Sequence, residues 1–175
     1  MYVADGLLTG LYTLGMRCTQ LLSAIGVALW PAVAAGQATD ARALSPALRT
    51  HVQGERFEVV TSLRGLPLGV RDELGRMFGR GSLDIAEPGA PFQSTDVVVT
   101  PMLPFRRLSK AWCANDHCFV YYERGGIAHT WHAALFHWSP AATKLEGGGM
   151  APGGLTTFDA VRDAIFGGGL KPGSW

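Results

Sequence analysis

The sequence predicts an α+β fold, with an antiparallel sheet of about five strands and helices packed mainly on one face. Three observations lead to this prediction. Runs of β-branched and aromatic residues of strand length are separated by Gly- and Pro-rich turns. Helical apolar stripes lie before and after these runs. Two cysteines separated by four residues, Cys113 and Cys118, stand between two of the runs at the spacing of a hairpin tip.

The first 38 residues have the organisation of a secretory signal peptide. The apolar run Leu21–Ala35 follows the basic residue Arg17, and small residues at Ala35 and at Ala38 suit cleavage by signal peptidase. Pro31 interrupts the run, which is shorter than the roughly 20 apolar residues of a transmembrane helix. We therefore expect cleavage rather than a retained membrane anchor.

Residues 39–175 are expected to form a single exported domain, periplasmic or secreted, with no stable membrane insertion after signal cleavage. Met16, directly before the basic residue of the signal, is the expected natural start. The formal net charge is +1 and no basic run occurs, so nucleic acid is excluded as the main partner. Cys113 and Cys118 are expected to be oxidised, because exported proteins with one cysteine pair at this spacing form disulfides.

Helices are expected in three segments, at residues 45–54, 67–78 and 156–167. Ser45 suits the N-cap of the first helix and is followed by a proline that suits its first turn. The second carries apolar residues at offsets of four, seven and eight from Val70, which is one face of a helix. Thr156 and Asp159 form a capping-box-like start for the third.

Strands are expected at residues 56–61, 96–100, 106–112, 118–123 and 128–138, which are rich in β-branched and aromatic side chains. Alternation places Leu108, Lys110 and Trp112 on one face of the 106–112 strand. Both faces of the 128–138 strand are apolar, which is typical of a strand covered on both sides. The glycine clusters at residues 147–149 and 152–154 predict a mobile loop.

No catalytic residue, metal site or cofactor is predicted. His129 and His137 share a strand face but lie about 27 Å apart at ~3.4 Å per residue, and His132 points the other way. His117 lies four residues from Cys113, but an oxidised sulfur is no nucleophile.

Two carboxylates can act in glycoside hydrolysis when they lie about 5 to 9 Å apart. Asp116 and Glu123 could approach each other in this way, but two acids near a hairpin are common by chance. A small hydrolase that uses His129 or His132 with Asp116 is a further alternative, for which no substrate can be named.

The hairpin tip Trp112–Cys118 resembles the loop of the periplasmic inhibitors of vertebrate (C-type) lysozyme, which reads Cys-Lys-Pro-His-Asp-Cys. That family is exported and has an antiparallel sheet with helices against it. The resemblance implies that the loop inserts into a lysozyme cleft, where its histidine meets the catalytic carboxylates. Here Asp116 precedes His117, the reverse of the family order, and Ala114 and Asn115 replace Lys and Pro.

A disulfide across this ring contributes about 2 kcal/mol by loop entropy, and it also holds the tip in one conformation, which lowers the ordering cost of binding. We therefore expect an exported, non-enzymatic protein that binds a protein partner through this loop, with a lysozyme-type muramidase as the best-specified partner. An envelope protein of unknown ligand with a purely structural disulfide is the alternative, and the apolar strands permit a homodimer. The predicted loop residues are Cys113, Ala114, Asn115, Asp116, His117 and Cys118.

Overall fold

The computed structural model describes residues 44–79, 83–97, 100–173 and 175, which belong to one compact unit. The predicted signal peptide, its cleavage positions and the start at Met16 lie outside these residues. Among the described residues, no helix combines the length and the apolar character that crossing a lipid bilayer requires.

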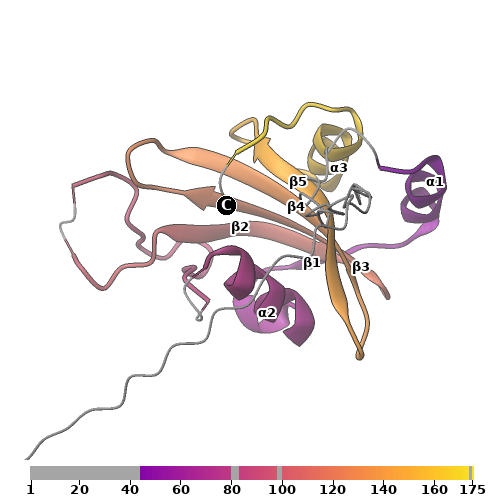
Figure 1. Ribbon diagram of the computed structural model, residues 1–175, viewed down its shortest axis with the longest axis horizontal. Helices are drawn as coiled ribbons and strands as arrows, with labels where there is room; N and C mark the ends of the chain where they lie inside the picture. Colours follow the sequence, from indigo (N-terminus) through magenta and orange to yellow (C-terminus); the bar gives the residue numbers. More distant parts are fainter. Residues whose placement is uncertain (1–43, 80–82, 98–99, 174) are drawn as a thin grey trace, which may run out of the picture. The chain divides into compact units, whose positions relative to one another are not determined.

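A five-stranded antiparallel sheet forms the centre of the fold (Figure 1). Its strands follow each other in space in the same order as in the sequence, so every neighbouring pair is joined without a crossover. The predicted α+β class and the antiparallel sheet are therefore confirmed. The strands are β1 (Glu58–Val60), β2 (Arg106–Cys113), β3 (His117–Arg124), β4 (Thr130–Trp138) and β5 (Thr143–Ala151).

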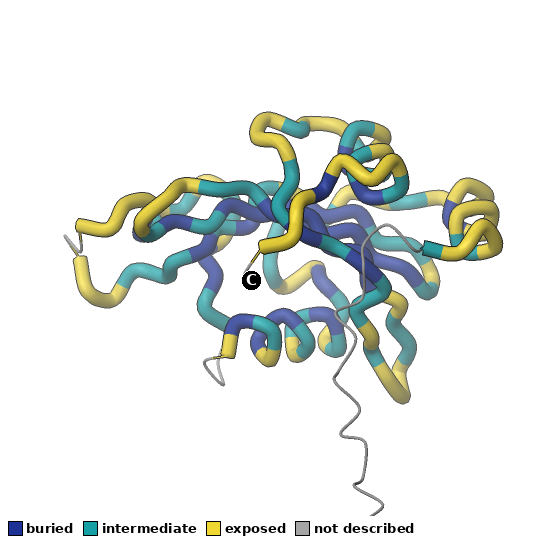
Figure 2. Tube along the Cα trace, turned by 45° about the horizontal axis from the view of Figure 1, so that its top comes forward, coloured by how far each residue is buried: buried dark blue, intermediate teal, exposed yellow. Residues whose placement is uncertain are grey.

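Helices cover both faces of this sheet. α2 (Leu68–Met77) packs on the face that carries Val120 and Tyr122 of β3, whereas α3 (Phe158–Phe166) packs on the opposite face. α1 (Pro46–Gly54) lies on the same face as α3 (Figure 1). The expectation of helices mainly on one face thus holds for α1 and α3, while α2 covers the other face. Burial is concentrated in the middle of the strands, between these two layers (Figure 2).

The helix ends follow the cap residues closely. The Ser45 hydroxyl accepts a hydrogen bond of 3.1 Å from the Leu48 amide, and α1 begins at Pro46 as predicted. α3 is capped by Thr157, one residue later than expected, because its hydroxyl accepts from the Ala160 amide. A short 3₁₀ helix, η2 (Leu63–Gly65), connects β1 to α2.

The glycine run 147–149 is part of a strand, and the prediction of a mobile loop there was wrong. These residues belong to β5 and pair with Ala133, Ala134 and Leu135 of β4. Glycine is needed here because other parts of the chain come very close to the strand. A Cβ on Gly148 would lie 2.5 Å from the Ala133 carbonyl oxygen and 2.7 Å from the Trp175 ring.

Substituting Gly148 with alanine should therefore destabilise the protein by about 1 to 3 kcal/mol, because the backbone of β4 and the C-terminal tryptophan would both have to move. Urea unfolding followed by tryptophan fluorescence measures this loss. Gly54→Ala is the matched control, since no atom lies within 4 Å of the Cβ it would add. Equal stability of the two variants would contradict the prediction.

The strand predicted at residues 96–100 is also wrong at the residues that the structure describes. Asp96, Val97 and Thr100 lie in bends, and Val97 is exposed. The Val97 carbonyl accepts a hydrogen bond from the Gln93 side chain instead of from a neighbouring strand. The sheet has five strands as expected because β5 takes the place of this segment.

A β-bulge changes the face assignment in β2. The register with β3 shifts between Leu108 and Lys110, so that Leu108 and Ala111 both face α2. Trp112 faces the α3 side. The prediction that Leu108 and Trp112 share a face was wrong, because the extra residue of a bulge inverts the alternation that follows it.

Candidate functional site

The hairpin between β2 and β3 ends in the predicted disulfide. Cys113 and Cys118 are bonded and lie opposite each other in the strand register. The turn is closed by a hydrogen bond of 2.7 Å from the Ala114 amide to the His117 carbonyl. Within this stapled tip Asn115 is the exposed residue, whereas the side chain of His117 is only 3% exposed.

His117 is buried because α1 covers that side of the tip. Its Nδ1 lies 2.7 Å from Oδ1 of Asp116 and 3.7 Å from Oε2 of Glu55. His51 Nε2 lies 3.0 Å from Oε1 of Glu55 and 3.2 Å from Oδ2 of Asp116. These four residues form one cluster, called here the α1–tip cluster. The ring of His137, which pairs with His117 in the sheet, lies 5.2 Å from the His117 ring.

His51 and Glu55 are not among the residues predicted from the sequence. Their spacing of four places them on one side of a helix end, which is a weak signal shared by many solvated helix faces. Only the docking of α1 against the tip brings them to Asp116 and His117.

The two carboxyl groups of the α1–tip cluster differ strongly in acidity. Burial of Glu55, assisted by the neighbouring Asp116 carboxylate, raises the pKa of Glu55 to about 7. Burial would also raise the pKa of Asp116, but its interactions with Glu55 and His117 outweigh this and lower it to about 2. Burial lowers the pKa of His117 despite the nearby Asp116 carboxylate. Asp116 is thus the acid of the pair that keeps its charge.

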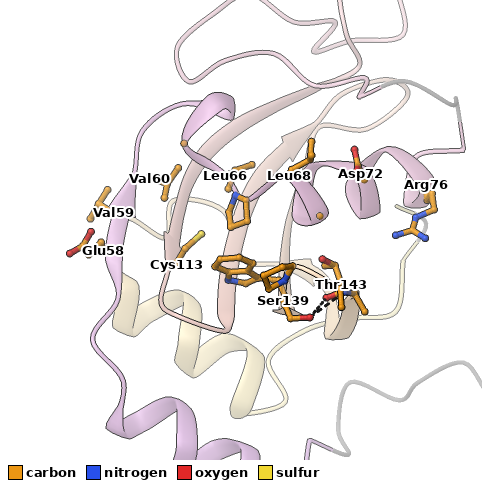
Figure 3. Close-up of a pocket in the computed structure, with 17 residues that line it drawn as sticks. Glu58, Val59, Val60, Leu66, Leu68, Asp72, Arg76, Cys113, Ser139 and Thr143 are labelled. Atoms are coloured by element: carbon orange, nitrogen blue, oxygen red, sulfur yellow. Dashed lines mark hydrogen bonds between the residues drawn. The ribbon is translucent and has the colours of Figure 1, made fainter.

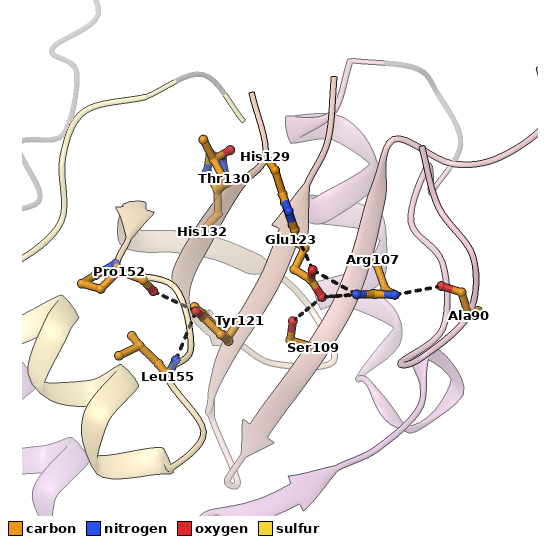
Figure 4. Close-up of polar contacts among 10 residues, drawn as sticks. All are labelled: Ala90, Arg107, Ser109, Tyr121, Glu123, His129, Thr130, His132, Pro152 and Leu155. Atoms are coloured by element: carbon orange, nitrogen blue, oxygen red, sulfur yellow. Dashed lines mark hydrogen bonds and ion pairs between the residues drawn. The ribbon is translucent and has the colours of Figure 1, made fainter. Parts of the chain in front are cut away.

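The other acid of the glycosidase alternative, Glu123, belongs to a different network at the far end of β3 (Figure 4). Its carboxylate accepts hydrogen bonds from Arg107 at 2.8 and 3.0 Å and from Ser109 at 3.2 Å. His129 Nε2 lies 2.9 Å from the same carboxylate. Seven residues of extended chain separate Glu123 from Asp116, about 24 Å, so the two acids do not form a glycosidase pair.

The histidines considered for hydrolysis are not brought to Asp116. His129 contacts Glu123, and His132 is fully buried on the α2 face, where its ring stacks on Tyr122 at 5.1 Å. The hydroxyl of Thr130 lies 3.0 Å from His132 Nε2 (Figure 4). The structure therefore separates the three residues that this alternative would need.

A cleft of about 960 Å³ opens on the α2 side of the stapled tip (Figure 3). Its walls are β1, the start of α2 and the turn between β4 and β5, and Cys113 lies in it. The exposed apolar residues Val59 and Leu68 line it, at 58% and 64% exposure, together with the charged residues Asp72 and Arg76. The cleft and the α1–tip cluster thus lie on opposite faces of the same hairpin end.

Comparisons of the chain with protein-family models, with curated proteins and with solved structures found no match. The geometry of the described residues therefore carries the functional inference.

Proposed function

We propose that this chain is an exported, non-enzymatic binding protein that receives an extended segment of a partner protein in the cleft beside the stapled tip. The observation that carries the proposal is that β1, an edge strand of the sheet, forms one wall of this cleft. β1 pairs with β2 alone in the strand order, so one side of β1 is the sheet edge. An exposed edge strand can accept a further strand from another chain.

The cleft supplies the side-chain contacts that such an extended segment needs. Val60 and Leu68 offer apolar surface, and Asp72 and Arg76 offer one charge of each sign. Large apolar side chains that remain exposed beside a concave surface are typical of protein-binding sites. The disulfide fixes the wall at Cys113, so less ordering is needed when the partner binds.

The resemblance of the Cys-x4-Cys tip to lysozyme inhibitors makes a lysozyme-type muramidase the partner to test first. In this proposal the tip contributes Asn115, which is exposed. His117 is covered by α1 and does not contact the partner. The periplasm or the extracellular medium is the proposed location, because the predicted signal and the disulfide both suit export.

Lysozyme clearing of cell-wall suspensions tests this function. The purified protein should slow clearing by at least one lysozyme type, and Leu68→Lys should weaken that inhibition by about tenfold or more by placing a charge in the cleft. Ile127→Lys is the matched control, since it changes an apolar residue that is 97% exposed in the turn between β3 and β4. Absence of inhibition across several lysozyme types would contradict the muramidase partner and favour an envelope protein with another ligand.

The double variant Cys113→Ser, Cys118→Ser should lose about 2 kcal/mol of the free energy of unfolding, which is the loop-entropy contribution of so small a ring. Urea unfolding of the oxidised protein and of the variant measures the difference. If the tip is a binding loop, the folded variant, assayed without urea, should also inhibit lysozyme less than the unchanged protein does. Unchanged inhibition by a folded variant would show that the disulfide is a staple only.

A further inference from the structure

The α1–tip cluster combines four side chains that can ligate metals, drawn from two separate elements. His51 lies in the last turn of α1 and Glu55 directly follows that helix. Asp116 and His117 lie in the stapled turn and at the start of β3. One ligand atom from each of the four lies within 4.8 Å of all the others. Two imidazole nitrogens and two carboxylate oxygens are a donor set that suits zinc and similar first-row divalent ions.

The four side chains lie close enough together to surround one ion. Zinc bonds to nitrogen and oxygen are about 2.0 to 2.1 Å long, which places neighbouring ligand atoms about 3.3 to 3.4 Å apart. Around the cluster, His51 Nε2 is 3.0 Å from Glu55 and 3.2 Å from Asp116. His117 Nδ1 is 2.7 Å from Asp116 and 3.7 Å from Glu55. These distances involve both oxygens of Glu55 and of Asp116, whereas one ligand atom from each residue lies within 4.8 Å of the other three, so the side chains must rotate to close a tetrahedral site.

A second observation points to a ligand at this position. Oε2 of Glu55 is buried and has no hydrogen-bond partner among the described residues. Such an oxygen, removed from water and left unsatisfied, costs free energy unless a cation or a proton compensates it. Oε2 is also the Glu55 oxygen that faces Nδ1 of the buried His117.

From this geometry we propose that His51, Glu55, Asp116 and His117 bind one divalent transition-metal ion of the zinc type. All four positions of a tetrahedral site are filled by protein, which is the arrangement of structural rather than catalytic zinc. The ion links the C-terminal end of α1 to the stapled tip and so orders both. The site lies on the face opposite the proposed partner cleft and does not depend on that function.

The histidine at the other end of the sheet offers an internal comparison. His129 also contacts a carboxylate, that of Glu123, and is partly exposed, as His51 is. Arg107 and Ser109 already donate to this carboxylate, so its surroundings favour an anion without a metal ion. His129→Ala therefore removes a comparable imidazole without removing a proposed ligand.

Titration of the chelator-treated full-length protein with zinc sulfate, followed by calorimetry and by thermal unfolding, tests the site. We expect one zinc ion per chain and a higher unfolding temperature with zinc for the unchanged protein and for His129→Ala. His51→Ala and Glu55→Gln should each lower zinc affinity at least about tenfold, because loss of outer-shell partners alone costs 10- to 100-fold. Cobalt in place of zinc should give the intense visible absorption of a tetrahedral site, and His51→Ala should abolish it.

Two results would overturn the proposal. One is the absence of stoichiometric zinc uptake by the unchanged protein. The other is uptake that persists at equal affinity in both His51→Ala and Glu55→Gln. Glu55→Gln keeps the size of the side chain, and each variant is first shown by circular dichroism to fold without zinc. Loss of zinc binding therefore reports on ligation, and lysozyme inhibition measured on the same variants separates this site from the proposed function.

Discussion

Replacing Phe119 with alanine should lower the free energy of unfolding by about 3 to 5 kcal/mol, the range for truncating a fully buried phenylalanine. Phe119 lies in the central strand β3 and is fully buried. Its ring contacts Phe57 at 5.2 Å, from the segment between α1 and β1, and Phe158 at 5.2 Å, from the start of α3. The substitution leaves a cavity where three elements meet, so no single neighbour can move to fill it.

Chemical denaturation at neutral pH measures this loss. Phe119→Leu keeps part of the volume and should be affected less than Phe119→Ala. Ile127→Ala is the control, since Ile127 is exposed and its truncation should change the free energy of unfolding by less than about 0.5 kcal/mol. A loss below about 1 kcal/mol for Phe119→Ala would show that the α3 side of the sheet is not a packed core.

Removing the imidazole of His132 should reduce the loss of stability in mild acid. Burial, with the positive charges of Arg124 and Arg106, lowers the pKa of His132 to about 4, below the usual 6.5. The unfolded chain therefore binds a proton at higher pH than the folded one. Above pH 6.5 the neutral His132 does not reduce the free energy of unfolding. As the pH falls toward 4, this free energy decreases by on the order of 2 kcal/mol, because the unfolded chain takes up the proton first.

The variant His132→Phe keeps a ring against Tyr122, which stacks on the imidazole at an interplanar angle of 12°. The difference between the denaturation midpoints at pH 7.5 and at pH 4.5 should be smaller for this variant than for the unchanged protein. Glu55 acts with the opposite sign, because its raised pKa gives stability that is lost as pH rises from 4.5 toward 7. Because Glu55 is present in both His132→Phe and the unchanged protein, its contribution cancels when the two are compared at the same pH. Identical pH profiles would contradict the prediction.

Local chemistry was sufficient to predict most elements. The cap of α1 depends on Ser45 and Pro46, which are adjacent in sequence, and both faces of β4 follow from simple alternation. The Cys113–Cys118 pair is close in sequence and needs only a two-strand hairpin to meet. Each of these features involves residues within a few positions of each other, so the local sequence pattern is enough to predict it.

Long-range packing decided the features that were predicted wrongly. The glycines of β5 look like a loop, and their place in a strand follows from the close approach of Trp175 and of the β4 backbone. The bulge near Ser109 has no signature in alternation, because it is set by the register against β3. The segment around Val97 has strand-forming residues, but its described carbonyl is bonded by Gln93 rather than by a partner strand.

The sequence by itself determined the class of the fold, the helices, the strands from β2 to β4 and the stapled tip. Only the tertiary structure decided what that tip faces. It placed α1 over His117, brought His51 and Glu55 to Asp116, and left the cleft beside Cys113 on the other face. The reason is physical: a strand or helix pattern specifies which side chains share a face, whereas the partner of that face is selected by packing between elements distant in the chain.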